Sequence, residues 1–172
     1  CSGLLHSQNA ENEEWRRAST LFEQIQPQYR GKPQGERITF FYANSLLNKK
    51  SYVLAAFQFE SFVKSYPISQ KVEEAAFLGA YCYYKQSPRH SLDQEETQNA
   101  IEKLQNFINY YPYSDKLSEA NDLVQELRIK LEYKQFEIAK QYNTIRDYTS
   151  AIKVLNSFIS DYPGTPYRED AL

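Results

Sequence analysis

Few residues in this chain have the types and spacing that chemistry requires. His90, Ser91 and Asp93 carry the side chains of a hydrolase triad, in which the serine attacks, the histidine moves the proton and a buried carboxylate orients the histidine. These three residues are near neighbours in one polar segment, where they cannot form a buried, ordered relay. The sequence therefore predicts no catalytic site.

Metal and thiol chemistry have equally little support. The chain has two histidines, His6 and His90, and no helix carries a histidine pair at ligand spacing. The acidic pairs Glu73-Glu74 and Glu95-Glu96 are typical of a solvated face or a helix start. Cys82 lies beside Ala80 in an apolar segment, so we expect it to be a small buried side chain. We expect no metal and no cofactor.

The first residue, Cys1, has a pattern of its own. It is followed by the small residues Ser2 and Gly3 and then by polar sequence through Asn12. This start is typical of a bacterial lipoprotein after removal of its signal peptide, so we expect lipidation of Cys1. The alternative is that the numbering begins here for an unrelated reason. No apolar run approaches the roughly 20 residues that span a bilayer, so any membrane attachment must be a lipid anchor.

A phrase of 21 residues recurs three times along the chain, and it reads A-x6-F-[VI]-x2-Y-P-x-[ST]-x4-[ED]-A. The copies span Ala55–Ala75, Ala100–Ala120 and Ala151–Ala171. A degenerate copy precedes them by 37 residues, with its Tyr29 at the position of Tyr66. Self-similarity at this period indicates a repeat protein whose function lies on an extended surface.

Each unit has the spacing of a pair of helices. The order Ala43, Ala55, Phe59, Phe62, Pro67 is that of the tetratricopeptide repeat. Small alanines let the two helices approach, and Tyr-Pro ends each second helix because proline cannot continue it. The Ser or Thr two residues after the proline is placed to cap the next helix.

The predicted fold class is therefore all-α, a tetratricopeptide-repeat solenoid of about four helix pairs with one extended helix. We expect a tether and irregular start over residues 1–14 and a solenoid over 15–172, with units near 15–37, 38–74, 75–119 and 120–172. Two insertions lengthen the later units. The polar segment Gln86–Thr97 is expected to be an exposed loop, and Leu117–Tyr142, without Pro or Gly, is expected to extend one helix by about four turns.

The first helix of each pair should line a concave groove. Phe40, Phe77 and Phe136 either face this groove or pack between neighbouring helices. The better candidates for holding an extended peptide are aromatic rings with a polar tip, amides and cations, namely Asn44, Asn48, Tyr81, Tyr84 and Lys85. Arg89 in the inserted loop could hold a carboxylate, although solvated loop charge is the commoner outcome.

Composition excludes one class of partner. The chain has 172 residues, of which 41% are apolar and 15% aromatic, and its net charge is −2. Such a chain can bury a continuous core but has no excess of positive charge for nucleic acid. We expect no nucleic-acid partner.

Three segments, residues 80–94, 100–112 and 162–171, resemble the BamD family, the lipoproteins of the outer-membrane β-barrel assembly machinery, in a form similar to its Bacteroidota branch. The loop phrase Ser87–Gln94 carries most of the likeness. The resemblance implies a periplasm-facing scaffold without enzymatic activity, anchored to the outer membrane through a triacylated Cys1. It also implies binding to a BamA-type barrel protein and other assembly-machinery subunits, and recognition of the C-terminal β-strand signals of unfolded outer-membrane proteins.

The chain departs from the family pattern at both ends, where a full first helix and a fifth repeat are expected. Two other functions fit the same repeats. One is a different periplasm-facing tetratricopeptide-repeat lipoprotein adaptor, and the other is a peptide-binding co-chaperone, for which Cys1 would carry no lipid.

Overall fold

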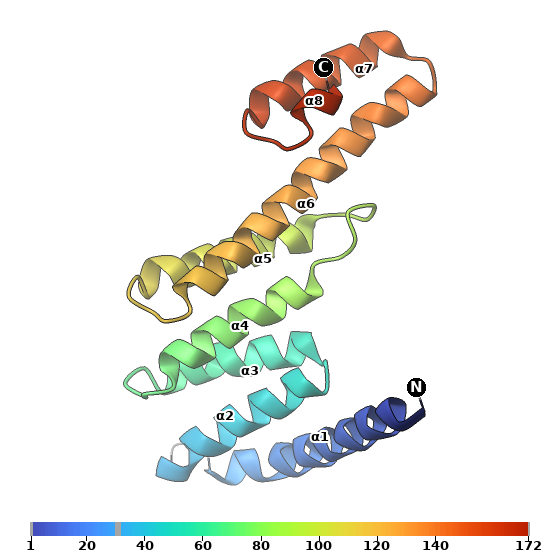
Figure 1. Ribbon diagram of the computed structural model, residues 1–172. Coiled ribbons are helices and arrows are strands. Elements are labelled where there is room, and N and C mark those ends of the chain that lie inside the picture. The colour runs from blue at the N-terminus through green and yellow to red at the C-terminus, as the bar shows by residue number, and fades with distance from the viewer. Residues whose placement is uncertain (1, 30–31, 172) are drawn as a thin grey trace.

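The computed structural model describes residues 2–29 and 32–171, with side chains for 12–29 and 32–170. These residues form helices and no strand, which confirms the predicted all-α class (Figure 1). In chain order the helices are α1 (Ser2–Tyr29), α2 (Pro33–Asn48), α3 (Tyr52–Ser65), α4 (Val72–Gln86), α5 (Glu95–Tyr110), α6 (Leu117–Thr144), α7 (Tyr148–Asp161) and α8 (Arg168–Ala171).

The helices run back and forth and stack in chain order from α1 to α7 (Figure 1). Three pairs, α2–α3, α4–α5 and α6–α7, follow one another, with α1 before them and the short α8 after them. The long helix α6 packs on α5 near its start and on α7 near its end. Its 28 residues, against 15 in α4, confirm the predicted helix extension.

The start of the chain differs from our expectation. Residues 2–14 are helical and belong to α1, so the described part of this region is not irregular. The first unit likewise holds one helix where a pair was expected. The physical reason is that residues 4–26 contain neither Pro nor Gly, so nothing in them ends a helix. The division into a tether and a solenoid stays a prediction.

Tyr-Pro ends every second helix, as predicted. Tyr66, Tyr111 and Tyr162 are the C-caps of α3, α5 and α7, with φ between −131° and −126° and ψ between 58° and 66°. In all three, the cap N–H still bonds the carbonyl four residues back, at 2.9 Å. The proline that follows has no N–H to offer, so the helix stops there.

The hydroxyl two residues after the proline has a different role from the predicted one. Ser69, Ser114 and Thr165 each accept the backbone N–H two residues further on, at 3.0, 3.0 and 3.3 Å. The N-cap positions of α4 and α6 are the lysines that follow, and neither helix has a side-chain cap. The helix-capping prediction is therefore wrong, because a hydroxyl this close to the turn reaches the turn's own N–H first.

The residue fixed by this hydroxyl covers a phenylalanine of the unit's first helix. The Lys71 ammonium lies 5.4 Å from the Phe40 ring centroid, and the Lys116 ammonium lies 5.4 Å from that of Phe77. In the last unit Tyr167 takes the lysine's place and stacks on Phe136 with the planes 13° apart. All three phenylalanines are buried, so they pack in the core and do not line a groove.

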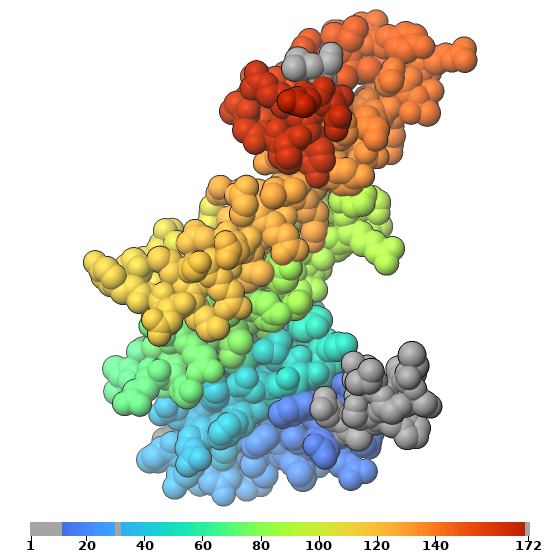
Figure 2. All heavy atoms as spheres, in the orientation of Figure 1, coloured from blue at the N-terminus to red at the C-terminus, as the bar shows by residue number. Residues whose placement is uncertain are grey.

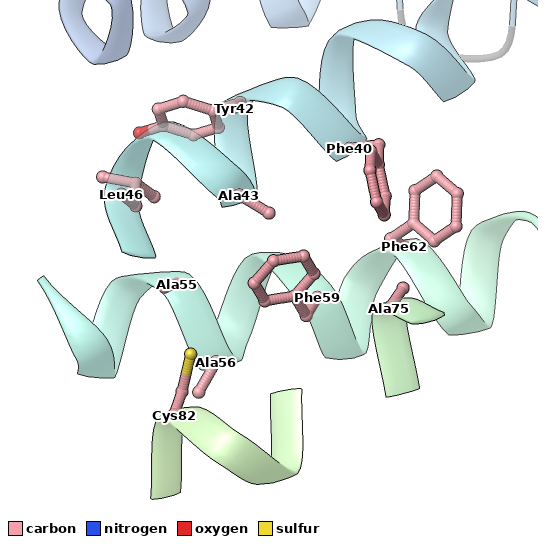
Figure 3. Packing of buried hydrophobic residues seen from close by; sticks show 10 residues of the cluster. All are labelled: Phe40, Tyr42, Ala43, Leu46, Ala55, Ala56, Phe59, Phe62, Ala75 and Cys82. Carbon is pink, nitrogen blue, oxygen red and sulfur yellow. The ribbon is translucent and has the colours of Figure 1, made fainter. Parts of the chain in front are cut away.

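Each pair is held by a contact between two phenylalanines. The ring centroids are 5.5 Å apart for Phe40 and Phe62, 5.4 Å for Phe77 and Phe107, and 5.9 Å for Phe136 and Phe158. The second ring of each pair also lies 5.3 Å from the tyrosine that ends its helix. Figure 3 shows this packing for the first of the three, with Phe40 beside Phe62.

The buried side chains form three clusters. The first, around α2 and α3, and the second, around α4, α5 and the start of α6, share Leu78 and Tyr83 as bordering residues. The third contains Phe136 and Phe158 and shares no residue with the others. Figure 2 shows the corresponding shape, in which the C-terminal pair projects from the stack and is joined to it through α6.

The alanines that open each phrase are buried at the helix contacts, as predicted. Ala55 and Ala100 have no exposed surface and Ala151 has 4%. We expect Ala100→Leu to lower the free energy of unfolding by about 1–3 kcal/mol, because the larger side chain forces the two helices apart. The neighbouring exposed substitution Asn99→Leu is the control and should leave it within about 0.5 kcal/mol. Urea denaturation measures both, and equal stability of the two variants would contradict the repeat alignment.

Candidate functional site

One side of α4 carries a row of stacked rings that runs from the buried Phe77 to the half-buried Tyr81 and Tyr84. The ring centroids of Phe77 and Tyr81 are 6.2 Å apart with planes at 25°, and those of Tyr81 and Tyr84 are 5.8 Å apart at 26°. The ammonium of Lys85 lies 4.9 Å from the Tyr81 centroid and 5.2 Å from that of Tyr84. Three of the predicted binding residues are therefore gathered in one cluster, which we call the α4 ladder: Phe77, Tyr81, Tyr84 and Lys85.

The outer end of the α4 ladder is held by α6. The Tyr84 hydroxyl lies 2.9 Å from both carboxylate oxygens of Glu126 and donates its proton to them. Burial, followed by the hydrogen bond to Glu126, raises the pKa of Tyr84, so the hydroxyl stays protonated as a donor. The two tyrosines of the ladder thus present a positioned aromatic face with the Lys85 ammonium beside it.

The two predicted amides lie on another helix. Asn44 and Asn48 are on α2, one turn apart, at the positions equivalent to Tyr81 and Lys85. Each amide donates one N–H to its own helix, Asn44 to the Phe40 carbonyl at 2.9 Å and Asn48 to the Asn44 carbonyl at 2.8 Å. What remains for a ligand is mainly the amide oxygen, an acceptor.

Arg89 lies apart from the α4 ladder, in the loop between α4 and α5. Its side chain is exposed, and no ion pair involves it in the described part of the chain. Its neighbour His90 sets its ring edge against Tyr133 of α6, with centroids 4.6 Å apart at 83°. Asp93 accepts the Glu95 N–H at 3.3 Å, at the start of α5. Two residues of the formal triad, His90 and Asp93, therefore contact different parts of the structure.

The inside of this loop is a buried polar network, which sequence reasoning missed. Thr97 donates to the Gln94 amide oxygen at 2.8 Å and lies 2.6 Å from the Ser87 hydroxyl. The Gln94 amide nitrogen in turn donates to the carbonyls of Arg89 and Leu92. Gln94 and Thr97 are 5% and 0% exposed, so the prediction of an exposed loop holds only for its outer residues.

The long helix supplies the remaining partners of the loop. Lys130 donates to the Ser87 hydroxyl at 2.9 Å, and Lys134 donates to the Leu92 carbonyl. Burial lowers the pKa of Lys130, and the Glu126 carboxylate partly opposes this. Lys130 and Lys134 are four residues apart and so lie on one face of the helix. This spacing is the feature of the sequence from which a polar partner opposite α6 could have been predicted.

The described residues were predicted to hold no metal site and no membrane-spanning helix. No group of three or more His, Cys, Asp or Glu side chains gathers among them. None of their helices combines the length and apolar character that crossing a membrane requires. Cys82 is buried, as expected, and burial raises the pKa of its thiol to about 12. Cys1 and the side chain of His6 lie outside the described residues.

Comparison with known proteins gives a family match and two curated relatives. The model of the family YfiO, described as outer membrane lipoprotein, matches residues 6–172. The outer membrane protein assembly factor BamD of Helicobacter pylori is 30% identical over 97 residues, covering 56% of this chain and 44% of the relative. The protein of the same name from Caulobacter vibrioides is 24% identical over 174 residues, covering 98% of this chain and 56% of the relative. The chain spans about half the length of these curated relatives.

The polar network predicts that the loop stabilises the joint with α6. We expect Thr97→Val, which keeps the shape and removes the hydroxyl, to cost about 1–2 kcal/mol because Gln94 and Ser87 lose a buried partner. The exposed loop substitution Ser91→Ala should change stability by less than about 0.5 kcal/mol. Urea denaturation measures both, and amide hydrogen exchange should show faster exchange in residues 87–97 of the valine variant. Equal stability of the two variants would mean that the network is not a support.

Proposed function

Because this chain belongs to the outer membrane lipoprotein family YfiO, we propose that it is a non-enzymatic scaffold of the outer-membrane β-barrel assembly machinery. The observation that carries the proposal is the family match over residues 6–172, together with two curated relatives that are both named outer membrane protein assembly factor. The fold is consistent with this role, since a helical stack offers a long surface on which several partners can sit side by side.

The scaffold is proposed to support a BamA-type barrel protein and to contact other subunits of the machinery. The joint between α4, α5 and α6 supports this role, because the Ser87–Gln94 loop is bonded to α6 at both Lys130 and Lys134. These bonds hold the middle of α6 against the loop between α4 and α5, so the surfaces of α4, α5 and α6 keep one arrangement for a partner.

The α4 ladder is proposed as the place where unfolded outer-membrane proteins are recognised. Tyr81 and Tyr84 offer flat faces for stacking, and Lys85 offers a positive charge for a carboxylate. The acceptor oxygens of Asn44 and Asn48 could bond main-chain N–H groups of an extended strand. Arg89, which lies apart from the ladder in the loop between α4 and α5, is proposed as a separate cation for a carboxylate.

The scaffold is proposed to lie on the periplasmic face of the outer membrane, anchored by lipid on Cys1. The residues from Ser2 to Asn12 support this position, because small and then polar residues after a cysteine are typical of lipoproteins. Two or three acyl chains bind a bilayer far more firmly than one, which gives lasting attachment without a membrane-spanning helix.

Affinity purification from native membranes tests the scaffold role. We expect the tagged protein to copurify with a barrel protein of the BamA type, because the complex is proposed to be stable. The barrel protein should be identified by mass spectrometry and should resist washing at moderate salt. Recovery of other envelope proteins without any barrel protein would contradict the assembly role and favour a different lipoprotein adaptor.

The same membranes test the anchor. A Cys1→Ser variant, expressed with its signal peptide, should lose acyl labelling and move to the soluble periplasmic fraction. If it stays in the membrane without acyl groups, protein partners hold it there and the lipid anchor is not needed.

Peptide binding tests the α4 ladder. A fluorescent peptide that ends in an aromatic β-strand signal should bind at about micromolar affinity or weaker, as expected of a small transient contact. Tyr81→Ala combined with Tyr84→Ala should weaken binding by roughly tenfold through the loss of stacking. Tyr84→Phe, which keeps the ring and loses only the bond to Glu126, is the matched control and should bind almost normally. Equal binding by the double variant would place the client site elsewhere.

A further inference from the structure

A second concave site lies away from the α4 ladder, between the second helices of two successive units. It is a hollow of about 390 Å³, with walls from α3 and α5 and a floor from α4. The walls are mainly apolar and aromatic, and are formed by Val63 of α3 and by Phe107, Tyr110 and Tyr111 of α5. A hollow of this size accepts one large side chain.

The floor is made of small residues. Ala75, Ala76 and Gly79 line it. The repeat places Ile38, Thr39 and Tyr42 at the equivalent positions of α2. The hollow therefore lacks three larger side chains that the preceding unit carries.

The preceding unit carries a tyrosine at the position of Gly79. Tyr42 is only 7% exposed, and its ring belongs to the first hydrophobic cluster, against which Phe22 of α1 also packs. Burial, followed by the nearby carboxylate of Glu23, raises the pKa of Tyr42, so its hydroxyl is protonated beside an acidic group. In this unit a buried tyrosine therefore lies near a glutamate of the preceding helix.

The hollow retains that glutamate but lacks the tyrosine. Glu60 is the counterpart of Glu23 and lines the hollow. Its carboxylate accepts the Lys103 ammonium at 2.7 Å and the Tyr83 hydroxyl at 3.0 Å, both of which also line the hollow. A carboxylate held in place by two donors, at the end of an aromatic hollow, is an acceptor prepared for a further hydroxyl.

We propose that this hollow is a docking site for the tyrosine side chain of a segment from a partner protein. The ring lies over Gly79, whose counterpart one unit earlier is Tyr42, and its hydroxyl donates to Glu60. Asn106 and Lys64, exposed on opposite walls, bond the main-chain carbonyls on either side of the tyrosine. Ala76, Gly79 and Tyr83 lie on a different face of α4 from Tyr81 and Tyr84, so this site is independent of the α4 ladder.

A matched set of short peptides tests the proposal on the whole chain. The probes are acetylated, amidated tetrapeptides, Ser-Tyr-Ser-Ser and its Phe and Ala versions, titrated into ¹⁵N-labelled protein. We expect the tyrosine peptide to shift the backbone signals of Ala76 and Asn106 with millimolar affinity. The phenylalanine peptide should bind about tenfold more weakly, because it lacks the bond to a charged acceptor. The alanine peptide should cause no shift.

Substitutions at the floor separate docking in the hollow from binding elsewhere. Gly79→Tyr restores the residue of the preceding unit and should abolish the shifts. Gly79→Ala is its control, since a Cβ there lies 3.4 Å from the Phe59 Cβ and leaves the hollow open, so binding should persist. Ala76→Thr, which copies Thr39, narrows the hollow with a smaller change and should weaken binding several-fold even if the tyrosine variant fails to fold. Glu60→Gln should reduce the preference for tyrosine over phenylalanine.

The proposal is overturned if the tyrosine peptide shifts no signal of the lining residues at tens of millimolar, or if Ala76→Thr binds as the natural chain does. Equal binding of the tyrosine and phenylalanine peptides would also overturn it, since the hollow would then be an unselective apolar site. The two proposals fail independently. A negative peptide titration does not argue against copurification with a barrel protein, and a failed copurification does not argue against tyrosine docking in the hollow.

Discussion

The contact between two phenylalanine rings within each unit sets the geometry of the whole stack. It joins α2 to α3, α4 to α5 and α6 to α7 at centroid distances between 5.4 and 5.9 Å. The second ring of each pair packs against the tyrosine that ends its helix. The first ring is covered by Lys71, Lys116 or Tyr167, depending on the unit. The covering residue is positioned by a hydroxyl in the turn. The phenylalanine pair, the tyrosine at the helix end and the residue held by the turn hydroxyl are therefore linked by successive contacts in every unit. A substitution of one of these residues should disturb the packing of the others.

Local sequence was sufficient to predict most of this fold. Tyr-Pro ends a helix because proline has no N–H to donate and restricts the backbone of the tyrosine before it. Residues Leu117 to Tyr142 contain no Pro or Gly, so no residue in this segment ends α6. The same argument should have been applied to residues 4–26, where α1 forms. The role of Ser69 and its counterparts was missed because helix capping and turn bonding need the same residue type at nearly the same position.

The candidate site was harder to predict because its contacts join residues far apart in the chain. Spacing placed Tyr81, Tyr84 and Lys85 on one side of α4, but the bond from Tyr84 to Glu126 spans 42 residues. The loop was misjudged for a related reason. Gln94 and Thr97 are polar and lie in a polar segment, yet they are hydrogen-bonded to each other. Thr97 also contacts the Ser87 hydroxyl, which accepts a bond from Lys130 of α6. Polar character indicates a need for hydrogen bonds, and it does not indicate exposure when the partners come from within the fold.

The separation of the third hydrophobic cluster has a consequence for how the molecule unfolds. In a one-dimensional stack, cooperativity passes between units through the apolar surface that they share. The first two clusters share Leu78 and Tyr83, whereas the cluster of Phe136 and Phe158 shares no residue with them. It is joined to them through α6, which contacts the Ser87–Gln94 loop by the polar bonds of Lys130 and Lys134 and by the ring of Tyr133. Polar contacts weaken with competing water and salt more readily than buried rings do. Among the three helix pairs, we therefore expect the C-terminal pair to melt or tilt first as a block, while the other two keep their native order.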